Sequence, residues 1–286
     1  MKKIALLFLV AAGLYACGSV PITGRRQLSL VSDQEVLSLS LQSYNEYIQT
    51  AQKSTDKAAT ALVVKVGTNI AKAVENYFEV TGQLELLSQF QWEFNLINDA
   101  QVNAFCMPGG KIVVYEGILP YTMDEAGLAV VLGHEVGHAI AKHSNERMSN
   151  QMALEMGGAA VSSVLSKSSS TTQTIGATVW GLGSELGVAL PFNRKQELEA
   201  DHLGLILMAI AGYDPNAAIP FWQRMSQQGG GTIEFLSTHP SDQTRVSEIT
   251  KKLPEAMEYY DSIWGKNAKG GSSQPTNTKT DNQWRF

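Results

Sequence analysis

The sequence predicts an α+β fold that is mainly helical, with a small β-sheet beside one buried helix. Apolar residues at helical spacing recur over 32–77 and 205–260, which indicates that helices dominate. Two short segments between them, 90–96 and 111–115, alternate in polarity or are rich in β-branched residues, which is typical of strands. The helix predicted directly after these strands carries Gly133-His134-Glu135-Val136-Gly137-His138, and the chain is organised around it.

Composition places the chain among globular proteins. Of its 286 residues, 44% are hydrophobic and 17% are charged, so a full core can form. A net charge of -5 argues against a nucleic-acid partner, which needs a basic surface. The two cysteines do not make a disulfide framework.

The first sixteen residues are typical of a secretory signal peptide. A basic start is followed by the apolar segment 4–16, which is too short to span a bilayer. Leu14-Tyr15-Ala16-Cys17 resembles the lipobox of bacterial lipoproteins, although Tyr15 stands where a small residue is usual. We therefore expect cleavage before Cys17 and lipidation of its thiol; the alternative is an ordinary signal peptide with an incidental cysteine. Residues 17–31, which contain Pro and Gly, are then expected to form a tether.

A lipid anchor at Cys17 predicts a protein on the periplasmic side of a cell envelope, held at the membrane. Gly18 follows the cysteine, and this favours the outer membrane over the inner one.

The folded domain is predicted to span residues 32–264, followed by a disordered tail at 265–286. Ser32 and Glu35 fit a capping box at the start of its first helix. Between the two strands, Gln101 to Phe105 leads to a turn at Met107–Gly110. An edge strand of this sheet could hold a peptide in extended form by backbone pairing.

The central helix is predicted to begin near Asp124 and to continue to about Met156. In a helix, His134 and His138 project from one face and can share a metal ion. Glu135 then lies beside the metal, where it can take a proton from water. A surface helix that carries two histidines by chance is the alternative, but the apolar neighbours indicate a buried helix.

A catalytic zinc ion usually has three protein ligands, so a third ligand is needed. Glu197 and Asp201 lie four residues apart on one helical face, so Glu197 can bind the metal while Asp201 accepts the free ring N–H of a histidine ligand. A solvated face with a Lys195 ion pair is the alternative for these two residues. Spacing alone leaves five candidates for the third ligand: His143, Glu197, Glu199, His202 and His239.

The segment 157–190 is rich in Gly, Ala and Ser, and its pattern fits either a packed helix pair or a lid. It includes a polar run at 163–174 that we expect to be a mobile loop. Further helices are predicted over 205–211 and 216–227, and a last helix reaches about Tyr260.

Six motifs occur together in this sequence: His134-Glu135-x-x-His138, Glu197-x-x-Ala200-Asp201, Val20–Arg25, Asn103–Phe105 with Pro108–Gly110, Ala211–Pro215, and Ser237–Pro240 with Arg245. Together they resemble the gluzincin metallopeptidase family of the CAAX prenyl endopeptidase, HtpX and the Oma-type peptidases. The similarity covers roughly residues 20–249 and is closest to a periplasmic lipoprotein member without transmembrane helices.

The resemblance implies a zincin-like metallopeptidase domain with one zinc ion per chain, bound by His134, His138 and Glu197. It implies that Glu135 is the general base. It also implies that Asn103, His239 and Arg245 face the cleft, where His239 or Arg245 could stabilise an oxyanion. In family members where the equivalent histidine caps the zinc, the enzyme is latent.

The expected function is therefore a zinc endopeptidase that degrades misfolded or unassembled cell-envelope proteins. The alternative is a zinc-containing periplasmic chaperone or outer-membrane assembly factor with latent proteolysis. A purely structural zinc site usually has four protein ligands and no adjacent base, so Glu135 favours the enzyme.

Overall fold

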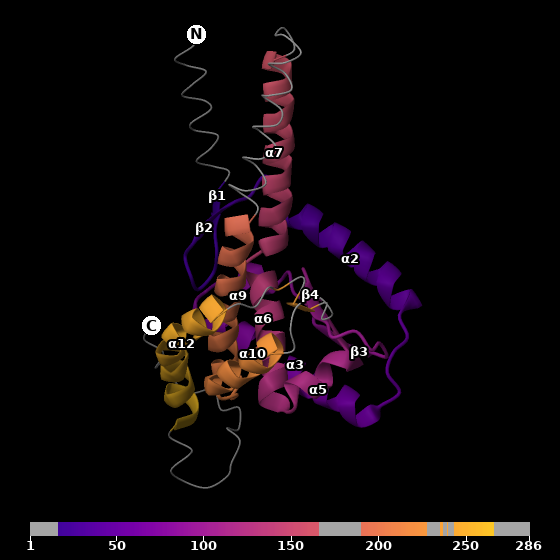
Figure 1. The fold of residues 1–286 in the computed structure, drawn as a ribbon, viewed down its shortest axis with the longest axis vertical. Helices are drawn as coiled ribbons and strands as arrows, with labels where there is room; N and C mark the ends of the chain where they lie inside the picture. The colour runs from indigo at the N-terminus through magenta and orange to yellow at the C-terminus, as the bar shows by residue number, and fades with distance from the viewer. Residues whose placement is uncertain (1–16, 166–189, 228–234, 237–238, 240–242, 266–286) are drawn as a thin grey trace.

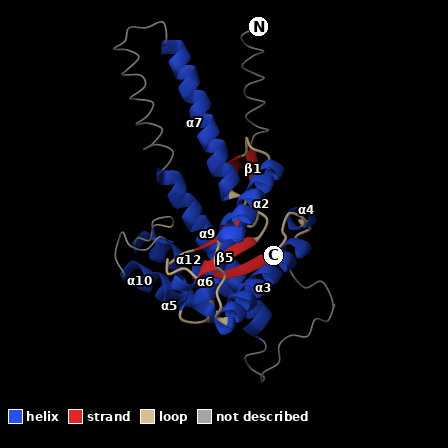
Figure 2. Ribbon diagram, turned by 90° about the vertical axis from the view of Figure 1, so that its right-hand side faces the viewer, coloured by secondary structure: helices blue, strands red, loops and turns tan. Residues whose placement is uncertain are grey.

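The computed structural model describes residues 17–165, 190–227, 235–236, 239 and 243–265. A helical body carries a small sheet, and one long helix, α7, projects from it (Figures 1 and 2). Within the described ranges, no helix combines the length and apolar character needed to cross a membrane. The predicted signal peptide, most of the predicted segment 157–190 and the tail from residue 266 lie outside these ranges.

The larger sheet has three strands in the order β3–β5–β4, which are β3 (Glu93–Ile97), β5 (Lys111–Tyr115) and β4 (Ala104–Met107). Strand β3 pairs parallel to β5, and β4 pairs antiparallel to β5. The turn between β4 and β5 requires glycine, because Gly109 and Gly110 have φ angles of 91° and 80°. The predicted strand 111–115 is confirmed with its bounds, and the strand predicted over 90–96 is confirmed but begins only at Glu93. Part of the segment between them, from Ala104, forms strand β4.

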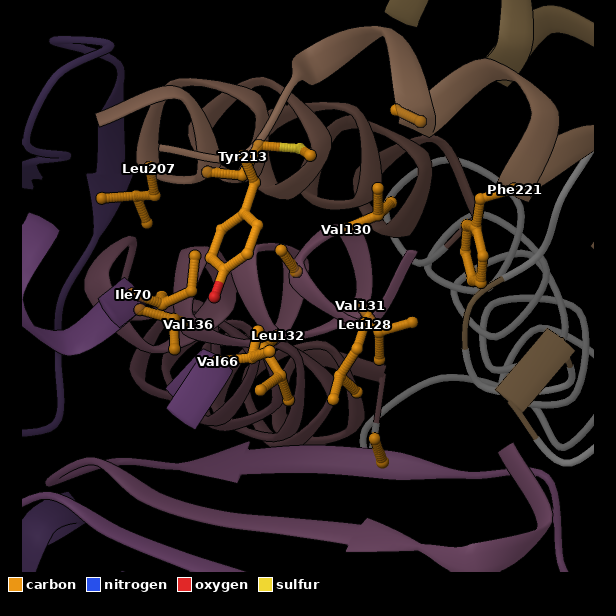
Figure 3. Close-up of a cluster of buried hydrophobic side chains, with 14 of the residues drawn as sticks. Val66, Ile70, Leu128, Val130, Val131, Leu132, Val136, Leu207, Tyr213 and Phe221 are labelled. Atoms are coloured by element: carbon orange, nitrogen blue, oxygen red, sulfur yellow. The ribbon is translucent and has the colours of Figure 1, made fainter. Parts of the chain in front are cut away.

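Two long helices precede this sheet, α2 (Asp33–Thr50) and α3 (Lys57–Val80). Ser32 caps α2 as expected, since its Oγ accepts the N–H of Glu35 at 3.2 Å. Helix α3 buries an apolar stripe that includes Val66 and Ile70. Figure 3 shows these two side chains packed among those of α6.

Helix α6 (Glu125–Ile140) lies at the centre of the molecule and is buried along most of its length. Asp124 begins it by accepting the N–H of Gly127 at 2.8 Å. Its valines and leucines pack against α3 and against Leu207 and Tyr213 (Figure 3). Leu207 belongs to α9 (Leu190–Ile210), which lies against the other face of α6.

Helices α6 and α9 approach each other through glycines. A Cβ on Gly133 would lie 2.8 Å from the carbonyl oxygen of Gly204, and one on Gly137 would lie 2.8 Å from that of Ala200. Such separations are shorter than van der Waals contact, so the two backbones are closer than side chains would allow. This approach brings the polar residues of α9 within reach of the histidines on α6.

The predicted continuation of α6 to about Met156 is wrong. Helix α6 ends at Ile140, and a new helix, α7 (His143–Leu165), begins after Ala141 and Lys142. Lys142 has a φ angle of 54°, which breaks the helix, and its ammonium group pairs with Asp33 at the start of α2. Ala and Lys are good helix formers, so this break has no local sequence signal.

The C-terminal part contains a short 3-10 helix, η3 (Pro215–Ala217), then α10 (Ala218–Gln227), α12 (Gln243–Tyr260) and a short π-helix, η4 (Asp261–Gly265). These elements agree with the two predicted C-terminal helices. Shorter elements complete the chain: α4 (Leu84–Leu87), η1 (Glu116–Ile118) and α5 (Leu119–Thr122).

The segment expected to be a tether is packed on the body instead of extending freely from it. Strands β1 (Cys17–Ser19) and β2 (Arg26–Leu28) form an antiparallel hairpin. Val20 in its turn is buried against Ala141 and Leu203. The hairpin therefore contacts both the end of α6 and the middle of α9.

Candidate zinc centre

Three side chains from α6 and α9 converge on one point. His134 and His138 lie one turn apart on α6, and their Nε2 atoms are 3.0 Å from each other. Glu197 on α9 places Oε2 3.4 Å from Nε2 of His134 and Oε1 3.3 Å from Nε2 of His138. All three side chains are buried, and the two histidines share one face of α6 because they lie four residues apart.

The arrangement fits a zinc ion. A tetrahedral zinc with bonds of about 2.0–2.2 Å separates its ligand atoms by roughly 3.3 Å, close to the observed separations. His239 adds a fourth ligand atom, and the four ligand atoms all lie within 4.8 Å of one another. Lone pairs that face one another inside a buried site are stabilised by a cation between them.

Asp201, held by Arg245, forms a hydrogen bond with His134 at Nδ1, the ring nitrogen that does not face the other ligands. Oδ1 of Asp201 lies 2.9 Å from Nδ1 of His134, so it accepts that ring proton and leaves the Nε2 lone pair for metal. Arg245 on α12 donates to both oxygens of Asp201 at 2.7 Å and stacks over the Trp222 ring. Burial alone would raise the pKa of Asp201, but Arg245 and the His134 ring hold that pKa below its ordinary value.

His143 and Glu199 support His138 in a different way. Nδ1 of His138 lies 2.7 Å from Nδ1 of His143, and Nε2 of His143 lies 3.0 Å from Oε2 of Glu199. Burial holds the pKa of His138 far below its ordinary value, so this ring is neutral. Both residues were candidates for the third ligand, but the structure places them behind the ligand His138. Sequence spacing missed this, because His143 returns to His138 only through the helix break at Lys142.

Glu135 lies beside the ligand atoms and is buried with them. Its Oε1 makes no hydrogen bond to the described residues and lies 3.4 Å from Nε2 of His239. Burial raises the pKa of this carboxyl above its ordinary value. A buried, under-satisfied carboxylate beside a metal site is suited to accept a proton from a substrate water.

His239 approaches the same point from the segment before α12. Its Nδ1 lies 3.0 Å from Oε2 of Glu197 and 3.1 Å from Nε2 of His134. Its backbone N–H donates to the carbonyl oxygen of Phe235 at 2.9 Å. The ring therefore stands where a fourth ligand of a tetrahedral zinc would stand.

The remaining predicted residues lie at different distances from this centre. Arg245 places Nη1 3.4 Å from Oε2 of Glu197, but its shortest hydrogen bonds go to Asp201, so its role in the cleft stays a prediction. Asn103 precedes β4, and its Oδ1 accepts the N–H of Ala104 at 2.9 Å, so its role in the cleft stays a prediction. His202 pairs with Glu255 at 2.9 Å, away from the ligand set. Cys17 is the first residue of β1.

Comparison with known proteins identifies this donor set. Residues 67–253 match the profile of Peptidase family M48. The mitochondrial metalloendopeptidase OMA1 of Schizosaccharomyces pombe is 39% identical over 191 residues, which cover 66% of this chain and 53% of that protein. The same enzyme of Saccharomyces cerevisiae is 30% identical over 272 residues, which cover 91% and 76%.

A more distant relative is the beta-barrel assembly-enhancing protease of Escherichia coli, 29% identical over 167 residues, which cover 56% of this chain and 34% of that protein. This chain spans about half the length of the fission-yeast relative. The matched family and the convergent geometry together assign His134, His138 and Glu197 as a zinc-binding site.

Proposed function

The chain belongs to peptidase family M48, and from this premise we propose that it is a zinc-dependent endopeptidase. One observation carries the proposal: a buried donor set formed by His134, His138 and Glu197, with a carboxylate oxygen of Glu135 beside it that accepts no hydrogen bond from the described residues. Three ligands and an adjacent base make a catalytic site rather than a structural one.

The chain's own residues supply the proton transfers. When bound, zinc acts as a Lewis acid that acidifies water and polarises the scissile carbonyl. Glu135 accepts the proton of the attacking water and later donates it to the leaving amine. Among the described strands β4 is an edge of the sheet, and it packs beside α6, so this edge is suited to pair with an extended substrate backbone.

We further propose that His239 holds the site latent. Its Nδ1 stands at the position that the attacking water needs, and its Nε2 faces Glu135. Substrate therefore reaches the centre only after His239 moves away. This feature also supports a second function, a zinc-containing chaperone or assembly factor whose proteolysis stays latent.

The physiological substrates are proposed to be misfolded or unassembled proteins of a cell envelope. Support comes from the names of two relatives, a mitochondrial metalloendopeptidase and a beta-barrel assembly-enhancing protease. The lipobox-like segment that ends at Cys17 supports a lipid anchor on the periplasmic side of the outer membrane. Metabolic labelling with a radioactive fatty acid tests the anchor, with Cys17→Ser as the unlabelled control.

The activity is tested by incubating the purified, zinc-loaded protein with casein. We expect slow cleavage by the wild type and faster cleavage by His239→Ala, with zinc retained in both. His202→Ala is the matched control, because this histidine lies outside the ligand set. If neither the wild type nor His239→Ala cleaves casein or another unfolded protein, the chaperone function replaces the peptidase.

A further inference from the structure

The N-terminal hairpin, residues 17–28, is anchored behind the zinc site. Its turn is closed by two backbone hydrogen bonds, from Val20 N–H to the Arg25 oxygen at 2.8 Å and from Gly24 N–H to the Val20 oxygen at 2.9 Å. Val20 is only 1% exposed and packs on Ala141 and Leu203. The turn is thus held between the end of α6 and α9.

Two side chains of this turn bind one carboxylate. Thr23 donates from Oγ1 to Oε1 of Glu199 at 2.5 Å, and Arg25 donates from Nε to Oε2 of Glu199 at 2.7 Å. The other two nitrogens of Arg25 bind both oxygens of Glu146 at 2.7 Å. Both carboxylates are buried, so the one guanidinium of Arg25 compensates two charges that are largely removed from water.

Glu199 passes this constraint to the metal ligand through His143. A carboxylate only accepts hydrogen bonds, so Nε2 of His143 must carry the proton and donate to Glu199. Nδ1 of His143 is then unprotonated and accepts a hydrogen bond from the Nδ1–H group of His138. This leaves the Nε2 lone pair of His138 directed at Glu197 and the metal position.

We propose that Thr23 and Arg25 are positioning residues for the zinc ligand His138, acting through Glu199 and His143. Docking of the hairpin holds the Glu199 carboxylate in place, and this fixes the tautomer and ring orientation with which His138 binds zinc. The hairpin is therefore part of the metal site, although it lies far from it in sequence. The inference rests on the zinc site and needs no particular substrate.

The test measures zinc affinity in the full chain by competition with a chromophoric chelator. In Glu199→Gln, the side-chain amide can donate a hydrogen bond to Nε2 of His143. The donor and acceptor roles in the hydrogen bonds from residue 199 through His143 to His138 would then be reversed. We expect a zinc dissociation constant roughly 10–100-fold higher, the usual effect of losing a group that supports a ligand. Arg25→Lys keeps the positive charge but loses the several N–H donors with which the guanidinium binds two carboxylates, and Thr23→Val loses only a hydroxyl. Both substitutions should therefore weaken zinc binding by less than Glu199→Gln does.

Arg26→Lys is the matched control, because Arg26 is the neighbouring arginine and its side chain is exposed. Its zinc affinity should equal that of the wild type. The absorption spectrum of the cobalt-substituted protein is a second readout, since it reports ligand geometry. We expect it to change in Glu199→Gln and Arg25→Lys and to stay constant in Arg26→Lys.

Wild-type zinc affinity and cobalt spectra in folded Arg25→Lys and Glu199→Gln would overturn the proposal. If Glu199→Gln fails to fold by circular dichroism, Arg25→Lys and Thr23→Val decide it. The measurement of zinc affinity does not require the protein to cleave a substrate, so it tests this proposal separately from the proposed peptidase activity. A protein that binds zinc through this chain of residues but leaves casein intact contradicts only the proposed peptidase.

Discussion

At the scale of single residues, the two histidine ligands obtain the same tautomer from two different supports. Asp201 accepts the Nδ1 proton of His134 directly. His138 instead donates to His143, which donates to Glu199. Both carboxylates come from α9, which also supplies Glu197, so one helix both completes the ligand set and orients the ligands of its neighbour.

Glu135→Gln tests the general base. The substitution keeps the shape of the side chain but removes its capacity to accept a proton, so turnover should fall by roughly 10²–10⁴-fold. Zinc content should stay at one ion per chain, because Glu135 is not a ligand. The measurements are casein cleavage and metal analysis of the same sample, and undiminished turnover with zinc bound would rule out this base.

At the scale of elements, the contact between α6 and α9 depends on glycines. A Cβ on Gly204 would lie 2.8 Å from the backbone nitrogen of His134, and one on Gly133 meets Gly204 equally closely. Any added methyl group must separate the helices that carry His134 and Glu197. The spacing of the zinc ligands is thus determined by the absence of side chains at this contact.

Gly133→Ala and Gly204→Ala should therefore lower the free energy of unfolding. Overpacking at such a contact costs about 1–3 kcal/mol, and we expect this cost to exceed the gain of about 1 kcal/mol in helix propensity that alanine brings over glycine. Urea unfolding and zinc titration check it, with weaker zinc binding expected in both variants. Gly265→Ala is the control, because its Cβ would be 3.4 Å from the nearest atom. Unchanged stability and affinity in both variants would show that the helices can separate without cost.

A second contact between elements depends on pH. Glu93 on β3 binds Lys111 on β5 at 2.6 Å and Tyr44 on α2 at 2.7 Å. The hydrogen bond from Lys111 holds the pKa of Glu93 below the ordinary 4.5. A lowered pKa in the folded state means that this contribution to stability is complete above pH 4.5 and disappears as pH falls through the folded pKa.

The melting temperature of Glu93→Gln should therefore lie below that of the wild type by a constant amount above pH 4.5. The difference should shrink at more acidic pH, where the wild type also loses the charge. Thermal melts over a pH series measure it. A difference that stays the same at every pH would mean that the Glu93 charge contributes nothing.

At the scale of the whole molecule, zinc connects parts of the chain that are distant in sequence. His134, Glu197 and His239 come from α6, α9 and the segment before α12. The unfolded chain has no such site, so zinc binds the native state and stabilises it by mass action.

Removal of zinc by a chelator should lower the melting temperature and abolish cleavage, and added zinc should restore both. At free zinc of about 100 times the dissociation constant, the stabilisation is about 2.7 kcal/mol. Calorimetry with and without chelator measures it, and His202→Ala should respond like the wild type. Equal melting temperatures with and without zinc would place the ion outside the folded core.

The sequence by itself determined the features that depend on neighbours along the chain. Helical spacing predicted His134 and His138 on one face, the Ser32 cap began α2 as expected, and β5 has the predicted bounds. These follow from local geometry, because a period of 3.6 or 2 residues is a property of the segment itself.

Spacing alone left five candidates for the third ligand, and the resemblance favoured Glu197. Only the tertiary structure showed that both Glu197 and His239 face the two histidines, and that Glu199 and His143 stand behind His138. It also decided that α6 ends at Ile140 and that the N-terminal hairpin packs against α9. Each of these depends on contacts between distant segments, such as the ion pair of Lys142 with Asp33 and that of Arg25 with Glu199. Local propensity carries no information about such partners, so the path from Arg25 to the metal ligand became visible only in the folded chain.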